Sequence, residues 1–337
     1  MSLATTLEME LAEMLNSLIP SAEMVRYGKN GTDATSASIR LARAYTKRDK
    51  VIVSGYHGWQ DWYIGTTTRN LGIPKAVCEL STAVPYNDLD SIEKLLKTEA
   101  YAAIIMEPCN VVAPQDSYLQ DIKNLCEKFG SLLIFDETIT GFRFSLGGAQ
   151  SYFKVTPHLS CFGKGMANGF PLSAVVGRKE IMNEMENIFF SGTFGGEALS
   201  LAASIATIKK LEKTKAIDHL WNIGEMLFLE ATDLIKKNGL QDIIALNGFA
   251  PWKILAFKDT KGATAAEVKT YFLQEMIQNG ILINGSHNVC YSFRKGEKDK
   301  TIRAYETVLS SLAECLSHGQ LQKKLKSPAI QPVFKVR

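Results

Sequence analysis

The segment SLLIFDE, residues 131–137, decides how this chain is expected to fold, because an apolar run of strand length ends there in two acidic residues. Such runs of Leu, Ile and Phe are typical of strands buried on both faces. A carboxylate at Asp136 is costly at the end of a buried strand unless a cation or hydrogen-bond donors meet it. The segment therefore predicts a strand that ends at a polar site, although simple capping of the next turn also explains the aspartate.

Further strand-like runs lie on both sides of this segment: KVIVS (50–54), AAIIME (102–107) and SAVVG (173–177). Helix-like stretches such as Asp116 to Phe129 separate them. Alternation of this kind predicts an α/β fold with a mostly parallel central sheet and crossover helices.

The chain is expected to begin with a helix and to change in character after about Lys210. Thr5 and Glu8 have the spacing of a capping box, so the chain is predicted to open on an amphipathic helix. After about Lys210 long charged helices alternate with the strand candidates KILAFKD (253–259) and GILIN (280–284). We expect a large domain over residues 1–210 and a smaller C-terminal α/β lobe over residues 211–337.

Composition excludes several function classes. The 337 residues carry a net charge of +3 without a concentrated basic stripe, so no nucleic-acid partner is expected. Six cysteines show neither a CxxC pair nor His/Cys metal spacing, which argues against zinc and disulfides and favours the cytoplasm. No apolar run is long enough to cross a membrane, and no signal peptide is recognisable.

Polar residues follow the predicted strands. Tyr56 and His57 come after the first run, Glu107 after the second and Asp136 at the end of the third. Ligands gather at the carboxyl ends of parallel strands, which makes these residues site candidates. Taken singly, a packed tyrosine and a satisfied histidine explain the GYHGW turn at residues 55–59 equally simply.

Two segments have the chemistry of phosphate cradles. NGTDATSAS, residues 30–38, places Gly31 and Thr32 before a helix, where free N–H groups and the helix dipole favour an anion. SGTFGGE, residues 191–197, repeats that chemistry around Thr193. Ordinary helix capping accounts for either segment alone.

Lys164 stands between two glycines in SCFGKGMANGFPLSAVVG, residues 160–177. It lacks the G-x-x-x-x-G-K-[ST] frame of a P-loop, which weakens the nucleotide-binding interpretation. A surface lysine and an amine kept free for a covalent bond both fit. A loop lysine, a strand-end carboxylate, an aromatic platform and two phosphate cradles together suit pyridoxal 5'-phosphate.

The chain resembles the class III, fold type I pyridoxal-phosphate aminotransferases, and within them the glutamate-1-semialdehyde aminomutase group. The resemblance rests on four segments in the family's order and extends over nearly all of the chain. They are LGIPKAV with PYND (71–77 and 85–88), DETITGFRFSLGGAQ (136–150), FGKGMANGFPLSAVVGRKEIM (162–182) and SGTFGGEALSLAA (191–203).

The resemblance implies a homodimer with a shared active site, and a role for each matching residue. Lys164 would form the aldimine with the cofactor and shuttle protons, while Asp136 would keep the ring nitrogen protonated. The remaining cofactor contacts implied are Gly31, Thr32, Tyr56, His57, Glu107, Asn110, Thr138, which replaces the family's usual valine, and Thr193 from the partner subunit.

The resemblance also implies the reaction, with departures that leave it open. The chain starts after the N-terminal arm of the aminomutases, and no acidic residue lies between Gly280 and Phe293, where the aminomutase glutamate is expected. We therefore expect an aminotransferase that acts on a small-molecule amino donor and a carbonyl acceptor. An aminomutase and a catalytically weak, cofactor-binding scaffold are the alternatives.

Overall fold

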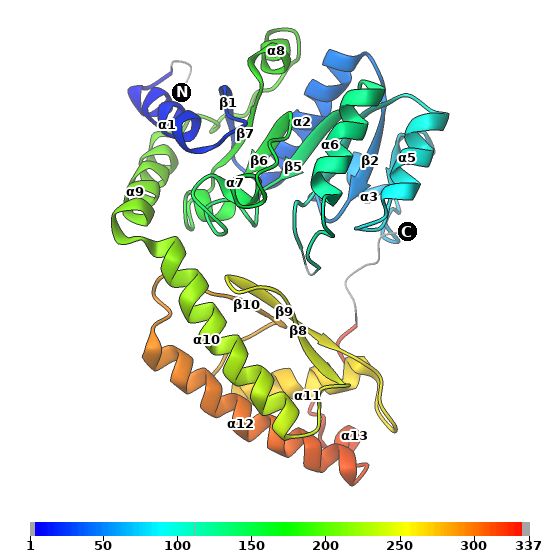
Figure 1. Ribbon diagram of the computed structural model, residues 1–337, viewed down its shortest axis with the longest axis vertical. Coiled ribbons are helices and arrows are strands. Elements are labelled where there is room, and N and C mark those ends of the chain that lie inside the picture. Colours follow the sequence, from blue (N-terminus) through cyan, green and yellow to red (C-terminus); the bar gives the residue numbers. More distant parts are fainter. Residues whose placement is uncertain (1–3, 111, 332–337) are drawn as a thin grey trace. The chain divides into compact units, whose positions relative to one another are not determined.

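A computed structural model describes residues 4–110 and 112–331 (Figure 1). The chain divides into two compact units, with the change between Lys215 and Ala216. The large unit holds the chain up to Asn110 and then Pro114–Lys215, and the small unit begins at Ala216. Each unit has its own apolar core, and they are described separately.

The large unit is built on a seven-stranded sheet in the described part of the chain, with the order β1-β7-β6-β5-β4-β2-β3. Its strands are β1 (Met24–Gly28), β2 (Lys50–Ser54), β3 (Ser81–Ala83), β4 (Tyr101–Met106), β5 (Leu132–Asp136), β6 (Leu159–Phe162) and β7 (Ser173–Gly177). Its helices are α1 (Thr6–Leu18), α2 (Gly31–Thr46), α3 (Asp61–Ile64), α4 (Lys75–Cys78), α5 (Leu89–Thr98), α6 (Tyr118–Phe129), α7 (Gly148–Phe153), α8 (Lys179–Met182) and α9 (Ala198–Thr214), with short 3-10 turns at Lys164–Met166 and Asn183–Glu186.

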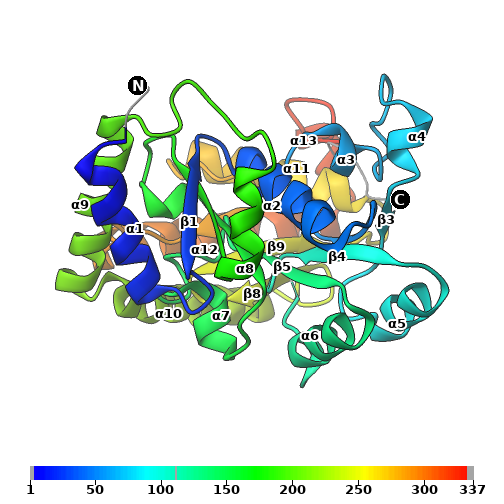
Figure 2. The ribbon, with the colours of Figure 1, turned by 90° about the horizontal axis from the view of Figure 1, so that it is seen from above.

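Strands β3, β2, β4, β5 and β6 run parallel to one another, which confirms the mostly parallel α/β sheet. Alternate residues of each strand enter different cores: Val51 and Val53 of β2 pack with α2, whereas Ile52 packs with residues of α5 and α6. The helices accordingly cover both faces of the sheet (Figure 2). This two-sided burial explains why the central strands are nearly continuous apolar runs.

Strand β7 departs from the expected parallel arrangement, because it pairs antiparallel with both β6 and β1. Residues 163–172 join β6 to β7, with a single 3-10 turn at Lys164–Met166 and no crossover helix. A parallel neighbour needs a long crossover, so this connection returns the chain in the opposite direction. Lys164 lies in this reversal.

The small unit contains the antiparallel sheet β10-β9-β8 in the described part of the chain. Its elements are α10 (Ala216–Lys237), β8 (Ile244–Phe249), β9 (Trp252–Phe257), α11 (Ala265–Gln278), β10 (Ser286–Asn288), α12 (Lys295–Ser317) and α13 (Leu321–Lys324). Buried residues of α11 and α12, including Phe272 and Tyr305, form its main core with β8 and β9. None of the described helices of either unit has the length and hydropathy needed to cross a membrane.

Two local predictions are wrong. GILIN is not a strand: it lies between Gly280 and Gly285, both with positive φ, and its Leu282 is fully exposed to solvent at 91%. The adjacent strand is β10, a few residues later. The first helix exists, but Thr5 caps it without a side-chain hydrogen bond, so the expected capping box does not form.

Candidate active site

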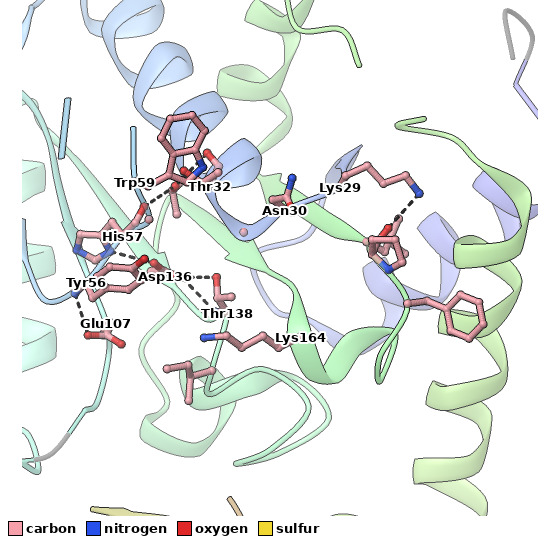
Figure 3. A pocket seen from close by; sticks show the side chains of 17 residues that line it. Lys29, Asn30, Thr32, Tyr56, His57, Trp59, Glu107, Asp136, Thr138 and Lys164 are labelled. Carbon is pink, nitrogen blue, oxygen red and sulfur yellow. Dashed lines mark hydrogen bonds and ion pairs between the residues drawn. The ribbon is translucent and has the colours of Figure 1, made fainter. Parts of the chain in front are cut away.

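A cavity of about 370 Å³ opens in the large unit where β2, β4 and β5 end and α2 begins (Figure 3). Side chains from segments far apart in the sequence meet there because parallel strands bring their carboxyl ends to one edge of the sheet. The predicted site residues that line it are Gly31, Thr32, Tyr56, His57, Glu107, Asp136, Thr138 and Lys164.

Asp136 and His57 form a buried pair in this cavity. The His57 Nδ1 atom lies 2.9 Å from Asp136 Oδ2, and its Nε2 atom lies 3.2 Å from the Ser54 carbonyl oxygen. Both ring nitrogens of His57 thus have partners. The contact with Nδ1 satisfies one oxygen of a carboxylate that is only 5% exposed.

The other oxygen of Asp136 is held by Thr138, two residues further along the chain. The Thr138 backbone N–H donates to Oδ1 at 3.1 Å, and the Thr138 hydroxyl donates to the same oxygen. Asp136 thus has donors on both oxygens, and its carboxylate has a fixed orientation toward the cavity.

Glu107 is a second carboxylate in the cavity, with a different environment. It follows β4, is 8% exposed and accepts one hydrogen bond from the Tyr56 backbone N–H at 3.1 Å. Burial, and secondarily the negative charge of Asp136, raise the pKa of Glu107 to about 7, with His57 acting in the opposite direction. At neutral pH Glu107 is therefore protonated in about half of the molecules, whereas an ordinary carboxyl group is almost fully ionised.

Lys164 places its amine in the same cavity. Burial among protein atoms lowers the pKa of Lys164, while the charges of Asp136 and Glu107 act in the opposite direction. A lowered pKa leaves more of the amine neutral, which a nucleophilic lysine requires. Its backbone has φ +40°, in the left-handed region.

The start of α2 has the features of an anion cradle. The Thr32 hydroxyl is buried and has no hydrogen-bond partner within the described residues. A Cβ on Gly58, whose φ is +104°, would lie 2.5 Å from that hydroxyl, so glycine is needed for the loop to close over the cradle. An unsatisfied buried hydroxyl beside the N-terminus of a sixteen-residue helix fits a phosphate group.

The structure also places residues at the site that the sequence did not single out. Lys29 donates through Nζ to the Pro171 carbonyl (3.0 Å), to Glu197 Oε2 (2.7 Å) and to Ser200 Oγ (3.3 Å). The hydrogen bond from Lys29, and secondarily those that Ser200 donates to the carboxylate, lower the pKa of Glu197 to about 2. We call Lys29, Pro171, Glu197 and Ser200 the clasp, because they join the segment before α2 to the Lys164 loop and to the start of α9.

Other cavity residues were missed as well. Trp59 is the last residue of the quoted GYHGW turn, and Phe170 follows the FGKG motif, so their place in or near those motifs was the available signal. Ile139 and Leu172 complete the apolar part of the lining. In the described part of the chain, no group of three or more His, Cys, Asp or Glu side chains could hold a metal ion.

Two predicted residues lie elsewhere. Asn110 is half-buried after β4 and does not line the cavity. Thr193 is exposed and lines a separate cavity of about 370 Å³ with Glu8, Arg26 and Tyr27. A single chain therefore does not bring Thr193 to Lys164, and its expected role in a partner's site remains a prediction.

A comparison of the sequence with known protein families identifies the family to which this chain belongs. The model of the family described as Aminotransferase class-III matches residues 2–296, and the chain belongs to that family. The predicted family, fold type and enzyme class are thereby confirmed, and pyridoxal phosphate is confirmed as cofactor at the level of the family.

Individual relatives differ in their named activities. The glutamate-1-semialdehyde 2,1-aminomutase of Methanothrix thermoacetophila is 36% identical over 333 residues, covering 90% of this chain and 77% of that protein. The 3-aminobutyryl-CoA aminotransferase of Cloacimonas acidaminovorans is 34% identical, covering 93% and 76%. The Sulfurisphaera tokodaii aminomutase is 44% identical over 229 residues, which cover 63% of this chain and 55%, about half, of the relative's length.

Solved structures share the fold. A transaminase with pyridoxal phosphate bound has a TM-score of 0.87 at 22% identity, covering 95% of this chain and 80% of that one. A glutamate-1-semialdehyde aminomutase from Pseudomonas aeruginosa has a TM-score of 0.82 at 21% identity, covering 93% and 77%.

Proposed function

We propose that this chain is a pyridoxal-phosphate-dependent aminotransferase that moves an amino group from an amine donor to a carbonyl acceptor. The observation that carries the proposal is the Lys164 amine, with its lowered pKa, in the same cavity as the buried Asp136–His57 pair. A nucleophilic amine facing a fixed carboxylate is the arrangement that this chemistry requires.

The residues of the cavity suit the parts of the cofactor. Gly31 and Thr32 would hold the phosphate at the start of α2, Asp136 would meet the ring nitrogen, and Tyr56 would support the ring. The cofactor, when bound, supplies an electron-withdrawing ring that stabilises negative charge on the substrate α-carbon. Lys164 Nζ would take up and return the proton of that carbon, for which a pKa below the ordinary lysine value is suited.

An aminomutase is the second candidate, because several relatives carry that name. Intramolecular transfer requires that one substrate carry both the amine and the carbonyl group. The segment from Gly280 to Phe293 contains no acidic residue, which favours transfer between separate donor and acceptor molecules. A cofactor-binding scaffold with weak activity is the third candidate.

A homodimer with shared sites accompanies the proposal, supported by the position of Thr193 outside the cavity of its own chain. We also propose a reducing compartment such as the cytoplasm. The six cysteines, none of them in a disulfide, support that assignment.

Borohydride reduction tests the catalytic lysine. Protein incubated with pyridoxal phosphate and reduced is expected to yield one pyridoxyl-modified peptide, with the label on Lys164. Label spread over surface lysines, or none, would contradict the proposal. A matched sample of the Lys164→Arg variant, which keeps the positive charge, is expected to stay unlabelled.

Single-turnover spectroscopy then separates the candidates. The pyridoxamine form mixed with carbonyl acceptors, and the pyridoxal form mixed with amino donors, should each convert within seconds in an aminotransferase. Rapid conversion by glutamate-1-semialdehyde alone favours the mutase. A failure of every donor to convert the cofactor would indicate a scaffold.

A further inference from the structure

Thr138 lines the cavity, and in this structure its hydroxyl has a specific partner. Both the Thr138 backbone N–H and the hydroxyl donate to Oδ1 of Asp136 (Figure 3). A valine has the same shape but no donor. The difference between the two side chains is therefore one hydrogen bond to the carboxylate proposed to meet the cofactor.

The packing around Thr138 fixes which way the side chain points. A Cβ on Gly31 would lie 3.0 Å from the Thr138 Cγ2 methyl, and a Cβ on Gly163 would lie 3.4 Å from it. The methyl group thus fills the space beside these glycines. With the methyl group held there, the hydroxyl is directed at Asp136.

The acceptor capacity of Asp136 is unevenly used. A carboxylate offers about four lone-pair positions, two on each oxygen. Within the described residues Oδ1 accepts from both donors of Thr138, whereas Oδ2 accepts only from His57 Nδ1. The open acceptor position of Asp136 is therefore on Oδ2.

We propose that the Thr138 hydroxyl is a positioning group that selects the oxygen of Asp136 for the cofactor: by saturating Oδ1, it leaves Oδ2 to accept from the ring nitrogen. Both His57 and the ring nitrogen would then donate to Oδ2. Turning the carboxylate so that its two oxygens exchange places would break the hydrogen bonds with Thr138. The inference rests on the proposed cofactor and adds a role for a residue expected only to pack against it.

Two cofactor forms and two variants test this inference. Thr138→Val removes the hydroxyl at constant shape, and Thr138→Ser keeps the hydroxyl and removes the methyl group. Apoprotein of each is titrated with pyridoxal phosphate and with its 1-deaza analogue, in which carbon replaces the ring nitrogen. Kd is measured by absorbance, and the Tm of each apoprotein is recorded separately.

We expect Thr138→Val to raise the Kd for pyridoxal phosphate about fivefold, which is the size of one typical hydrogen bond. The Kd for the deaza analogue should stay within about twofold, because that analogue has no ring nitrogen to meet Asp136. Thr138→Ser should restore the affinity for pyridoxal phosphate.

Equal weakening of both cofactor forms by Thr138→Val, or no weakening of either, would overturn the inference. Failure of the wild-type protein to bind pyridoxal phosphate would instead overturn the proposed function. The two failures are therefore distinguishable.

Discussion

At the scale of single residues, the cavity contains two carboxylates whose surroundings differ. Asp136 accepts from three donors, whereas Glu107 accepts from the Tyr56 N–H alone among the described residues. Burial therefore raises the pKa of Glu107 to about 7. Glu107 is therefore the carboxyl group of the cavity that is expected to titrate near neutral pH.

The raised pKa of Glu107 makes stability depend on pH. An unfolded glutamate titrates near its ordinary value of about 4.3, so between there and pH 7 the folded protein binds more protons than the unfolded chain. Stability then falls as pH rises, by up to about 4 kcal/mol from this group. We expect Glu107→Gln to raise Tm relative to the wild type more at pH 8 than at pH 5.

Calorimetry of apoprotein at the two pH values measures this effect. Glu180→Gln, at an exposed position of α8, is the control and should give the same Tm difference at both. A pH-independent effect of Glu107→Gln would show that the ionisation of Glu107 is not coupled to folding.

The candidate site was partly predictable from the sequence. Asp136 and Lys164 stand in local motifs, one at the end of an apolar strand and one between glycines. The bond from Lys29 to Glu197 joins residues 168 positions apart, and the pair His57 and Asp136 is separated by 79 positions. Such contacts depend on the order of strands in the sheet, which no local pattern encodes.

At the scale of elements, the ends of the central strands were predicted well, because apolar runs buried on both faces have clear limits. KVIVS and SAVVG coincide with β2 and β7. The strands β1, β3, β8 and β10 were missed, since they are only partly buried and their apolar runs have no clear limits. Strand β6 was missed although it is buried, because it is only four residues long. The reversed direction of β7 was not predictable from its composition, because the connection sets it.

The clasp makes an element-scale prediction. Exposed ion pairs contribute little to stability, about 0.2–1 kcal/mol. Lys29 and Glu197 nevertheless connect three segments of the site, so Lys29→Gln and Glu197→Gln should each raise the Kd for pyridoxal phosphate several-fold. The double variant should be no worse than either single one, because both changes remove the same contact.

Titration of the four proteins with pyridoxal phosphate gives this double-mutant cycle. Lys50 and Glu99 form an ion pair of similar length, but more exposed, away from the cavity, and Lys50→Gln is the control. Additive effects of Lys29→Gln and Glu197→Gln on Kd would mean that the two residues act independently.

At the scale of the whole molecule, the small unit carries its own pH dependence. His287 on β10 is half-buried, and its Nε2 atom lies 2.7 Å from the Tyr305 hydroxyl in the core. Burial lowers the pKa of His287 to about 4. Between there and the ordinary histidine pKa of about 6.5, the unfolded chain binds more protons, so stability falls as pH drops through this window.

Protonation of His287 lowers the free energy of unfolding by at most about 3 kcal/mol. His287→Gln is expected to lessen the loss of stability between pH 7 and pH 4.5, measured by denaturant unfolding followed in the small unit. His318→Gln, at the exposed end of α12, is the control. An unchanged pH profile in His287→Gln would contradict the prediction.

The proposed dimer predicts complementation between two inactive proteins. If Thr193 serves the partner's site, a Lys164→Ala chain and a Thr193→Ala chain together rebuild one complete site in each mixed dimer. Random assortment of the two chains then restores about a quarter of the wild-type activity. If the refolded mixture regains no activity, each active site is built from one chain.

The left-handed backbone at Lys164 lowers the stability of the fold, although the proposed function requires a lysine there. Glycine or asparagine adopts φ +40° more readily than lysine, by about 1 kcal/mol. Directed evolution that rewards heat resistance alone should therefore discard this lysine early, and homologues that have lost activity should drift toward glycine or asparagine there. A lysine retained at this position in a sequenced genome would then report that selection still acts on chemistry.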